Sequence, residues 1–182
     1  MKPLVLALLC VLPSLACAQD LDGEHWSFKL TPSVYSNRDT PQATDLNLRS
    51  NLGPHALWIG QYRQSGFGEQ LRTGYEYTAS LDGGQVVYSL QAAERGFAGG
   101  AVSAQVGHEV YGIVGWGRTN LRTYYNLNFD PNDAITLGLG GWWHKQHQIS
   151  LYRIQDDRLH TGQRVTHLVW RYHPDNAHRL TL

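Results

Sequence analysis

Residues 120–130 read N-L-R-T-Y-Y-N-L-N-F-D, the clearest alternation in the chain. Every second residue, from Leu121 to Phe129, carries an apolar or partly apolar side chain. Arg122, Tyr124, Asn126 and Asn128 lie between them. Alternation with a period of two places successive side chains on opposite faces of a β-strand. The sequence therefore predicts a strand over residues 120–130, with one face in an apolar environment and the other in a polar one.

The same alternation recurs along most of the chain, in segments separated by turn residues. The predicted strands cover residues 26–36, 45–52, 55–64, 71–79, 85–92, 102–106, 120–130, 134–143, 148–155 and 162–173, and residues 179–182 begin another. Glycines in residues 107–119 leave the strand limits there open, so the expected number is about 10 to 12 strands. Between residues 55 and 64, the expected apolar face comprises Ala56, Trp58, Gly60 and Tyr62.

Two turn motifs indicate how neighbouring strands connect. Leu81-Asp-Gly-Gly84 favours a hairpin, because glycine permits the positive φ angles that two-residue turns require. Asp130-Pro-Asn-Asp133 is typical of a type I turn, with proline where its fixed φ angle is needed. We therefore expect residues 120–130 and 134–143 to form a hairpin, and the chain to fold as an antiparallel, up-and-down, all-β structure.

The first 18 residues have the features of a cleaved secretion signal. Lys2 precedes the apolar run 4–12, and Ala16-Cys17-Ala18 has the A-x-A pattern of a cleavage site. The run is shorter than the roughly 20 residues of a transmembrane helix. We expect residues 1–18 to be removed and residues 19–182 to form one domain. A lipoprotein signal with Cys17 as the lipidated residue is the alternative. Either way, Cys10 and Cys17 provide no disulfide or thiolate metal site in the mature domain.

Composition indicates what surrounds the folded chain. The 15 basic and 15 acidic residues balance, so no strong charge favours nucleic acid as a partner. After the signal, Lys29 and Lys145 are the only lysines, whereas a water-covered surface is usually rich in lysine and glutamate. Six Trp and ten Tyr suit the headgroup level of a membrane, where aromatic girdles form. These features favour an outer surface that largely does not face water.

As a whole, the chain resembles the small outer-membrane β-barrel proteins of Gram-negative bacteria, through its signal, alternating strands, short turns and aromatic bands. The resemblance implies a transmembrane β-barrel, because backbone groups in lipid must pair with one another and no apolar helix follows the signal. It also implies contact with outer-membrane lipid and insertion by the barrel assembly machinery. We expect a monomer with no cofactor, and an enzymatic role is the less favoured reading.

Such barrels usually finish on a strand ending in an aromatic residue, whereas this chain stops at Thr181-Leu182. A truncated sequence, a last strand at 162–173 followed by a tail, or an unusual closure would each account for that end.

If the apolar faces meet lipid, a set of polar residues lines the interior. These are Asp45, Asn47, Arg49, Arg72, Glu76, Arg122, Asn126, Asn128 and Arg171. Buried charges are tolerated when they are paired, and both signs occur on the predicted faces. One reading is a polar core that fills the barrel and gives it a structural role. The other is a narrow, porin-like channel in which the excess of arginine favours anions.

Three alternatives remain open at the level of sequence. A soluble periplasmic barrel of the lipocalin kind has the same alternation with its apolar faces inward. His25-Trp-Ser27 resembles the H-x-S arrangement of outer-membrane lipid A deacylases, in which serine is the nucleophile and histidine its base. His144 and His147 have a spacing that could hold a metal ion, with His160 as a further candidate, although no third ligand is fixed by spacing. We expect neither a catalytic nor a metal site.

Overall fold

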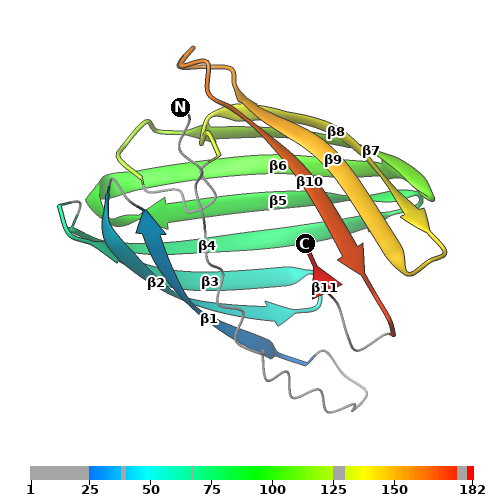
Figure 1. Cartoon of the computed structure of the whole chain (residues 1–182), viewed down its shortest axis with the longest axis horizontal. Coiled ribbons are helices and arrows are strands. Elements are labelled where there is room, and N and C mark those ends of the chain that lie inside the picture. Colours follow the sequence, from blue (N-terminus) through cyan, green and yellow to red (C-terminus); the bar gives the residue numbers. More distant parts are fainter. Residues whose placement is uncertain (1–24, 38–39, 67, 125–129, 176–179) are drawn as a thin grey trace.

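The computed structural model describes residues 25–37, 40–66, 68–124, 130–175 and 180–182. Eleven antiparallel strands form one sheet in which each strand pairs with the next in sequence (Figure 1). They are β1 (Ser27–Asn37), β2 (Thr40–Leu52), β3 (His55–Gln64), β4 (Gly68–Leu81), β5 (Gly84–Ala93), β6 (Phe97–Gly107), β7 (Val110–Thr119), β8 (Ala134–Trp143), β9 (His147–Asp156), β10 (Arg164–Tyr172) and β11 (Leu180–Thr181), with a 3-10 turn at η1 (Glu94–Gly96). The predicted all-β, up-and-down architecture and the strand number are confirmed. In the described ranges, no helix is long and apolar enough to cross a membrane.

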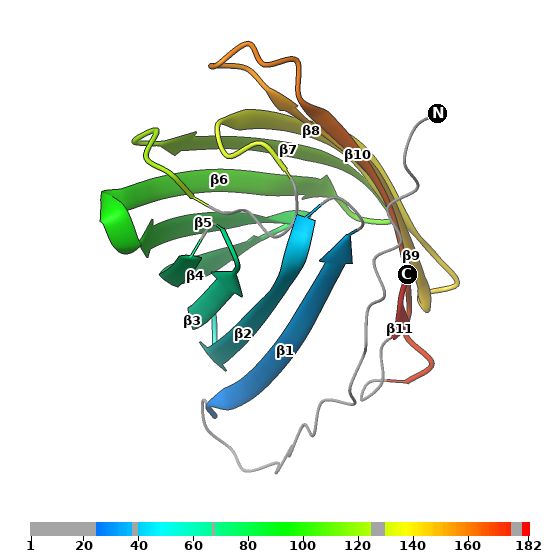
Figure 2. The same cartoon turned by 60° about the vertical axis from the view of Figure 1, so that its left-hand side comes forward.

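The sheet curls strongly, so that it has a convex outer face and a concave inner face (Figure 2). Strand pairing runs continuously from β1 to β11, and among the described residues no pairing joins these two strands to each other. Large apolar side chains are exposed on the outer face of every long strand, with Leu90, Leu139 and Leu168 each more than 60% accessible. The most buried side chains, including Tyr62, Gln70 and Arg72, lie on the inner face.

The predicted face of β3 is wrong. Strand pairing places Tyr62 opposite Asp45 on β2 and Gln70 on β4, and its side chain is fully buried on the inner face. Ala56, Trp58 and Gly60 share that face, whereas Leu57 and Ile59 are exposed on the outside. Both alternating sets of β3 contain large apolar residues, so hydrophobicity within this strand does not determine which set faces outward.

The predicted strand over residues 120–130 is also wrong where the structure describes it. Residues 120–124 and Asp130 have no strand conformation, and residues 125–129 lie outside the described ranges. Asn120 ends the strand: its amide donates to the carbonyl of Gly96 and its side-chain oxygen accepts from the backbone N–H of Ala98. Leu121 follows with a φ of 60°. The partner of β8 is therefore β7, the glycine-rich segment whose limits the sequence left open.

Consequently, Asp130-Pro-Asn-Asp133 does not close a hairpin. It belongs to the long connection 120–133 between β7 and β8, which begins and ends at one edge of the sheet. The other connections at this edge are 38–39, 65–67, η1 and 157–163. The opposite edge carries the two-residue turns 53–54, 82–83 and 108–109, the three-residue turn 144–146, and the connection 173–179 that leads to the short strand β11. We call these the long-loop end and the short-turn end.

Glycines on the inner face make room for aromatic rings from neighbouring strands. A Cβ atom on Gly140 would lie 2.4 Å from Cζ of Tyr111, and one on Gly74 would lie 2.4 Å from Cε2 of Trp58. Both glycines are paired with those aromatic residues across the sheet. The rings therefore lie against the backbone of the next strand, which keeps large side chains close to the wall of a narrow interior.

Candidate functional site: the polar interior

Two ion pairs connect β2 and β4 across the inner face of β3. The guanidinium of Arg49 donates to both carboxylate oxygens of Glu76, at 3.1 and 2.6 Å. Arg72 donates to Oδ1 of Asp45 at 2.6 Å, and both side chains of this second pair are about 95% buried. Two parallel N–H···O bonds fix the orientation of the first pair. The second pair holds two charges that would be costly to bury alone.

Gly60 lies between the two strands and allows the buried pair to form. A Cβ atom at this position would lie 3.2 Å from Nη2 of Arg72 and 2.9 Å from the side-chain nitrogen of Asn47. The absence of a side chain on β3 thus lets Arg72 pass over the strand to reach Asp45. The pairing depends on the register of three strands, and each partner is 27 residues from the other in sequence.

The connection between β7 and β8 enters the interior beside this pair. Gln70 donates from Nε2 to the carbonyl of Thr123, at 3.4 Å. The ring of Tyr124 stacks on Phe97 with centroids 4.1 Å apart. Burial raises the pKa of the Tyr124 phenol, and the charge and hydrogen bond of Arg72 only partly oppose that effect. The described part of the loop therefore contacts β4 and β6 from within the curl of the sheet.

The far end of the same loop is held by two carboxylates. Asp133 accepts hydrogen bonds from the backbone N–H and the hydroxyl of Thr119 and from the guanidinium of Arg158, the last at 2.8 Å. Burial acts to raise the pKa of Asp133, but these hydrogen bonds and the charge of Arg158 outweigh it and lower the pKa. Asp130 lies 2.7 Å from Nε2 of His167 on the inner face of β10. The loop is thus tied to β7, to the β9–β10 connection and to β10.

A hydrogen-bonded network covers the inner wall from β7 to β10. Tyr111 Oη lies 2.8 Å from Ser150 Oγ, and Gln148 donates from Nε2 to Tyr111 Oη at 2.8 Å. Arg171 in turn donates to Oε1 of Gln148 at 3.0 Å. Tyr111, Gln148 and Ser150 are buried. The network fixes these side chains along the wall, next to open space at the short-turn end.

The structure places most of the predicted interior residues on the inner face. Asp45, Asn47, Arg49, Arg72, Glu76 and Arg171 all lie there, four of them in the two ion pairs. Arg122 is exposed in the β7–β8 connection rather than on a strand. Asn126 and Asn128 lie outside the described residues. Sequence reasoning missed Tyr111, Gln148 and Ser150, because no motif marks them and their contacts depend on the register of β7, β8 and β9.

The weaker catalytic and metal candidates lie at or beside the ends of strands. Ser27 begins β1, and its hydroxyl accepts a 3.4 Å hydrogen bond from the amide of Asn51. His147 packs against Trp143 and accepts at Nδ1 from the indole of Trp170, whereas His160 lies at the opposite end of β9. Within the described ranges, no three His, Cys, Asp or Glu residues gather in an arrangement that could hold a metal ion.

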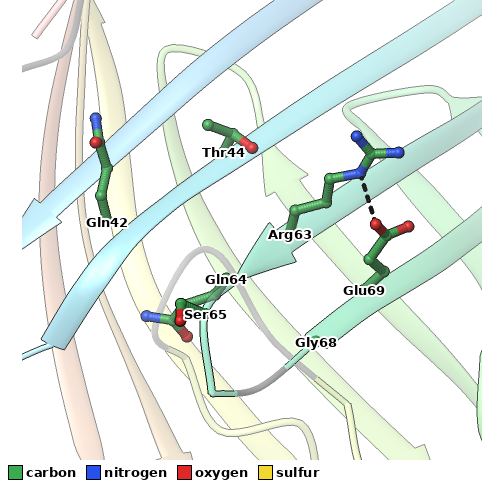
Figure 3. Close-up of a pocket in the computed structure, with 7 residues that line it drawn as sticks. All are labelled: Gln42, Thr44, Arg63, Gln64, Ser65, Gly68 and Glu69. Carbon is green, nitrogen blue, oxygen red and sulfur yellow. Dashed lines mark ion pairs between the residues drawn. The ribbon is translucent and has the colours of Figure 1, made fainter.

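The described residues form a hollow at each end of the sheet. One, of about 370 Å³, lies at the long-loop end around the β3–β4 turn (Figure 3). In it, Nε of Arg63 lies 3.2 Å from Oε1 of Glu69. Both of these side chains are more than half exposed, and their charges neutralise each other. The other, of about 260 Å³, lies at the short-turn end of the inner face. It is lined by Gly84, Gln85, Gln105, Gly107, His108, Tyr111, Trp142 and Gln148.

Comparisons of this chain with protein-family models, with curated proteins and with solved structures found no match.

Proposed function

We propose that the chain is an integral outer-membrane β-barrel protein whose outer face contacts lipid. The observation that carries this proposal is the apolar outer face: each of the long strands presents leucine, isoleucine, valine or aromatic side chains outward, and these are exposed. Exposed apolar patches of more than a few hundred Å² are rare on soluble monomers. The 10-residue lengths of β3, β5, β7, β8 and β9 match the 9 to 11 residues or so of a tilted membrane-spanning strand.

Aromatic side chains at the short-turn end support the same proposal. On the outer face, the ring of His147 contacts those of Trp143, Trp170 and Tyr172, with centroids 4.8 to 5.8 Å apart. Trp26 and Phe28 stack near the start of β1. Aromatic girdles of this kind occur where a barrel meets the lipid headgroups. The two-residue turns at one end and the long connection 120–133 at the other are likewise typical of outer-membrane barrels, in which the short turns lie in the periplasm.

A soluble lipocalin-like barrel fits the geometry less well. Such a protein needs an apolar inner face that can hold an apolar ligand, with a polar surface outside. Here the inner face holds the Asp45–Arg72 pair and the Tyr111–Ser150 network, while the leucines lie outside. Each face therefore has the polarity that a membrane-spanning barrel requires.

Within this proposal, we favour a structural role with an occluded lumen over an open channel. The ion pairs, the wall network and Tyr124 of the β7–β8 connection occupy the interior, and Tyr124 lies beside the buried pair. A narrow channel is the second form of the same function. Its solutes would pass the arginines of the inner face, which favour anions.

Arginine substitutions at two depths on one outer face test the membrane proposal. Leu151 lies in the middle of β9, and Gln155 lies near its long-loop end on the same face. In a bilayer, an arginine near the midplane costs about 2 to 4 kcal/mol and one near the interface about 0 to 1. We therefore expect L151R to unfold at clearly lower urea concentration in lipid vesicles than Q155R. If the free energies of unfolding of both variants lie within about 0.5 kcal/mol of the wild-type value, as expected for exposed sites in water, the proposal is wrong.

The lipid A hydrolase reading has a separate test. Ser27 would have to act as the nucleophile, so S27A should change the lipid A of cells that express the chain if the reading holds. We expect an unchanged lipid A profile, measured by mass spectrometry, because the Ser27 hydroxyl is engaged with Asn51 at the start of β1.

A further inference from the structure

The hollow at the short-turn end of the inner face is uncharged but strongly polar. No Asp, Glu, Lys or Arg lines it, although such residues are frequent elsewhere on the inner face. Its walls provide three glutamine amides, one imidazole, one phenol and one indole. Five consecutive strands, β5 to β9, contribute to it. A ligand of this hollow must therefore be recognised by hydrogen bonds and ring contacts rather than by charge.

Two of the amides are available to a ligand. Gln85 and Gln105 face each other across β5 and β6 on the inner face. Among the described residues, neither side chain has a hydrogen-bond partner, whereas Gln148 is held by Tyr111 and Arg171. An amide side chain offers both donors and an acceptor. A pair of facing amides therefore complements groups that also donate and accept, and hydroxyls are such groups.

Trp142 completes the hollow with an aromatic surface. Its side chain is 40% exposed, and its ring centroid lies 5.5 Å from that of His173, the residue that follows β10. An exposed indole ring gives an apolar plane onto which the C–H face of a sugar ring can pack. The volume of about 260 Å³ is slightly below the roughly 300 Å³ at which pockets for drug-sized ligands begin, so it suits one small ring.

We propose that this hollow binds one ring of a neutral saccharide, with hydroxyls on Gln85 and Gln105 and an apolar face against Trp142. The inference goes beyond the proposed membrane role and does not depend on whether the lumen is open. The saccharide could be a free hexose or an end of a cell-wall glycan. Both present the same hydroxyl-bearing ring, and the acetamido group of the glycan sugar distinguishes them.

The test uses the full chain refolded in a detergent without a sugar headgroup. Saturation-transfer NMR measures binding of D-glucose, of N-acetyl-D-glucosamine and of the anionic sugar D-glucuronate. We expect saturable binding of at least one neutral sugar with a Kd in the millimolar range, and no comparable binding of D-glucuronate. Preference for glucose indicates a free hexose, and preference for N-acetyl-D-glucosamine indicates a cell-wall glycan.

Two amide variants and a matched control identify the site. Q85L and Q105L each remove one hydrogen-bonding group, so each should weaken binding about fivefold to tenfold. Q91L is the control, because Gln91 lies on the same inner face of β5 but does not line the hollow. Circular dichroism shows which variants are folded, and one folded amide variant is enough to test the site. Three results would overturn the proposal: no saturable binding of either neutral sugar at about 50 mM, equal binding of D-glucuronate, or equal weakening by Q91L.

Discussion

The ring of Tyr124 stacks on that of Phe97 with their centroids 4.1 Å apart, and this contact brings the β7–β8 connection onto the inner face of the sheet. Phe97 is almost completely buried at the start of β6. A stacked aromatic pair of this kind contributes about 0.5 to 1.5 kcal/mol beyond the burial of its area. This side-chain contact therefore holds the Tyr124 part of the loop inside the curl, in addition to the covalent links of the loop to β7 and β8.

Removing the Tyr124 ring should open the interior. We expect Y124A to show larger single-channel conductance than wild type in planar bilayers, because the ring no longer occupies the space beside Arg72 and Asp45. Y88A is the control, since Tyr88 is exposed on the outer face of β5. Equal conductance of Y124A, Y88A and wild type would show that Tyr124 does not limit passage through the barrel.

Acidification should release the far end of the same loop. The pKa of Asp133 is lowered from its usual 3.8, so its carboxylate stabilises the folded loop above that pH and loses this effect as pH falls through the lowered value. We expect hydrogen exchange of the Asp130, Asn132 and Asp133 backbone amides to accelerate relative to the strands below about pH 4. D133N should exchange rapidly at every pH. D82N, in the exposed β4–β5 turn, should keep the wild-type pH dependence.

Breaking the buried ion pair should be far more costly than breaking an exposed one. R72M leaves the Asp45 carboxylate buried without its partner, for which we expect a loss of about 3 to 5 kcal/mol in the free energy of unfolding. R63M breaks the exposed pair with Glu69 and should cost about 1 kcal/mol or less. Urea unfolding in vesicles measures both values, and similar losses would contradict the burial of the first pair. The double variant R72M/D45L should recover part of the loss.

A methyl group on Gly140 should displace the Tyr111 ring. The new Cβ would lie 2.4 Å from Cζ of Tyr111, so we expect G140A to lose about 1 to 3 kcal/mol of stability and to disrupt the bond to Ser150. G112A is the matched control on neighbouring β7, where the nearest atom to a new Cβ is the Val106 carbonyl oxygen at 3.9 Å. If G140A and G112A unfold at the same urea concentration, the close packing of Tyr111 on Gly140 is not supported.

The sequence predicts the strands well where only one alternating set is apolar. On β2, Leu46 and Leu48 alternate with polar residues, and the predicted outer face agrees with the structure. On β3, both sets contain large apolar residues, and the outward set is determined by pairing with Asp45 and Gln70 rather than by hydrophobicity. Residues 120–130 alternate as a strand does. However, β8 can pair with only one strand on the edge away from β9, and β7 occupies that position.

The sequence predicts that polar side chains line the interior, but it does not predict which of them contact one another. Alternation alone places Arg49 and Glu76 on the polar faces of their strands. Their bidentate contact also requires the register between β2, β3 and β4. The hollow with Gln85 and Gln105 was not predicted, because glutamine is common on polar strand faces and no spacing marks a facing pair. Contacts between strands depend on register, and a slip of two residues preserves the alternation within each strand, so alternation alone does not identify the partners.

The meander topology also sets an order of assembly. Every strand pairs with its sequence neighbour, so the sheet can grow one strand at a time, and most of these steps close only a short loop. The contact between Gln70 and Thr123 spans 53 residues and needs β4 and β6 in place first. We therefore expect the β7–β8 connection to dock late in folding, after β4 and β6 have taken their places in the sheet.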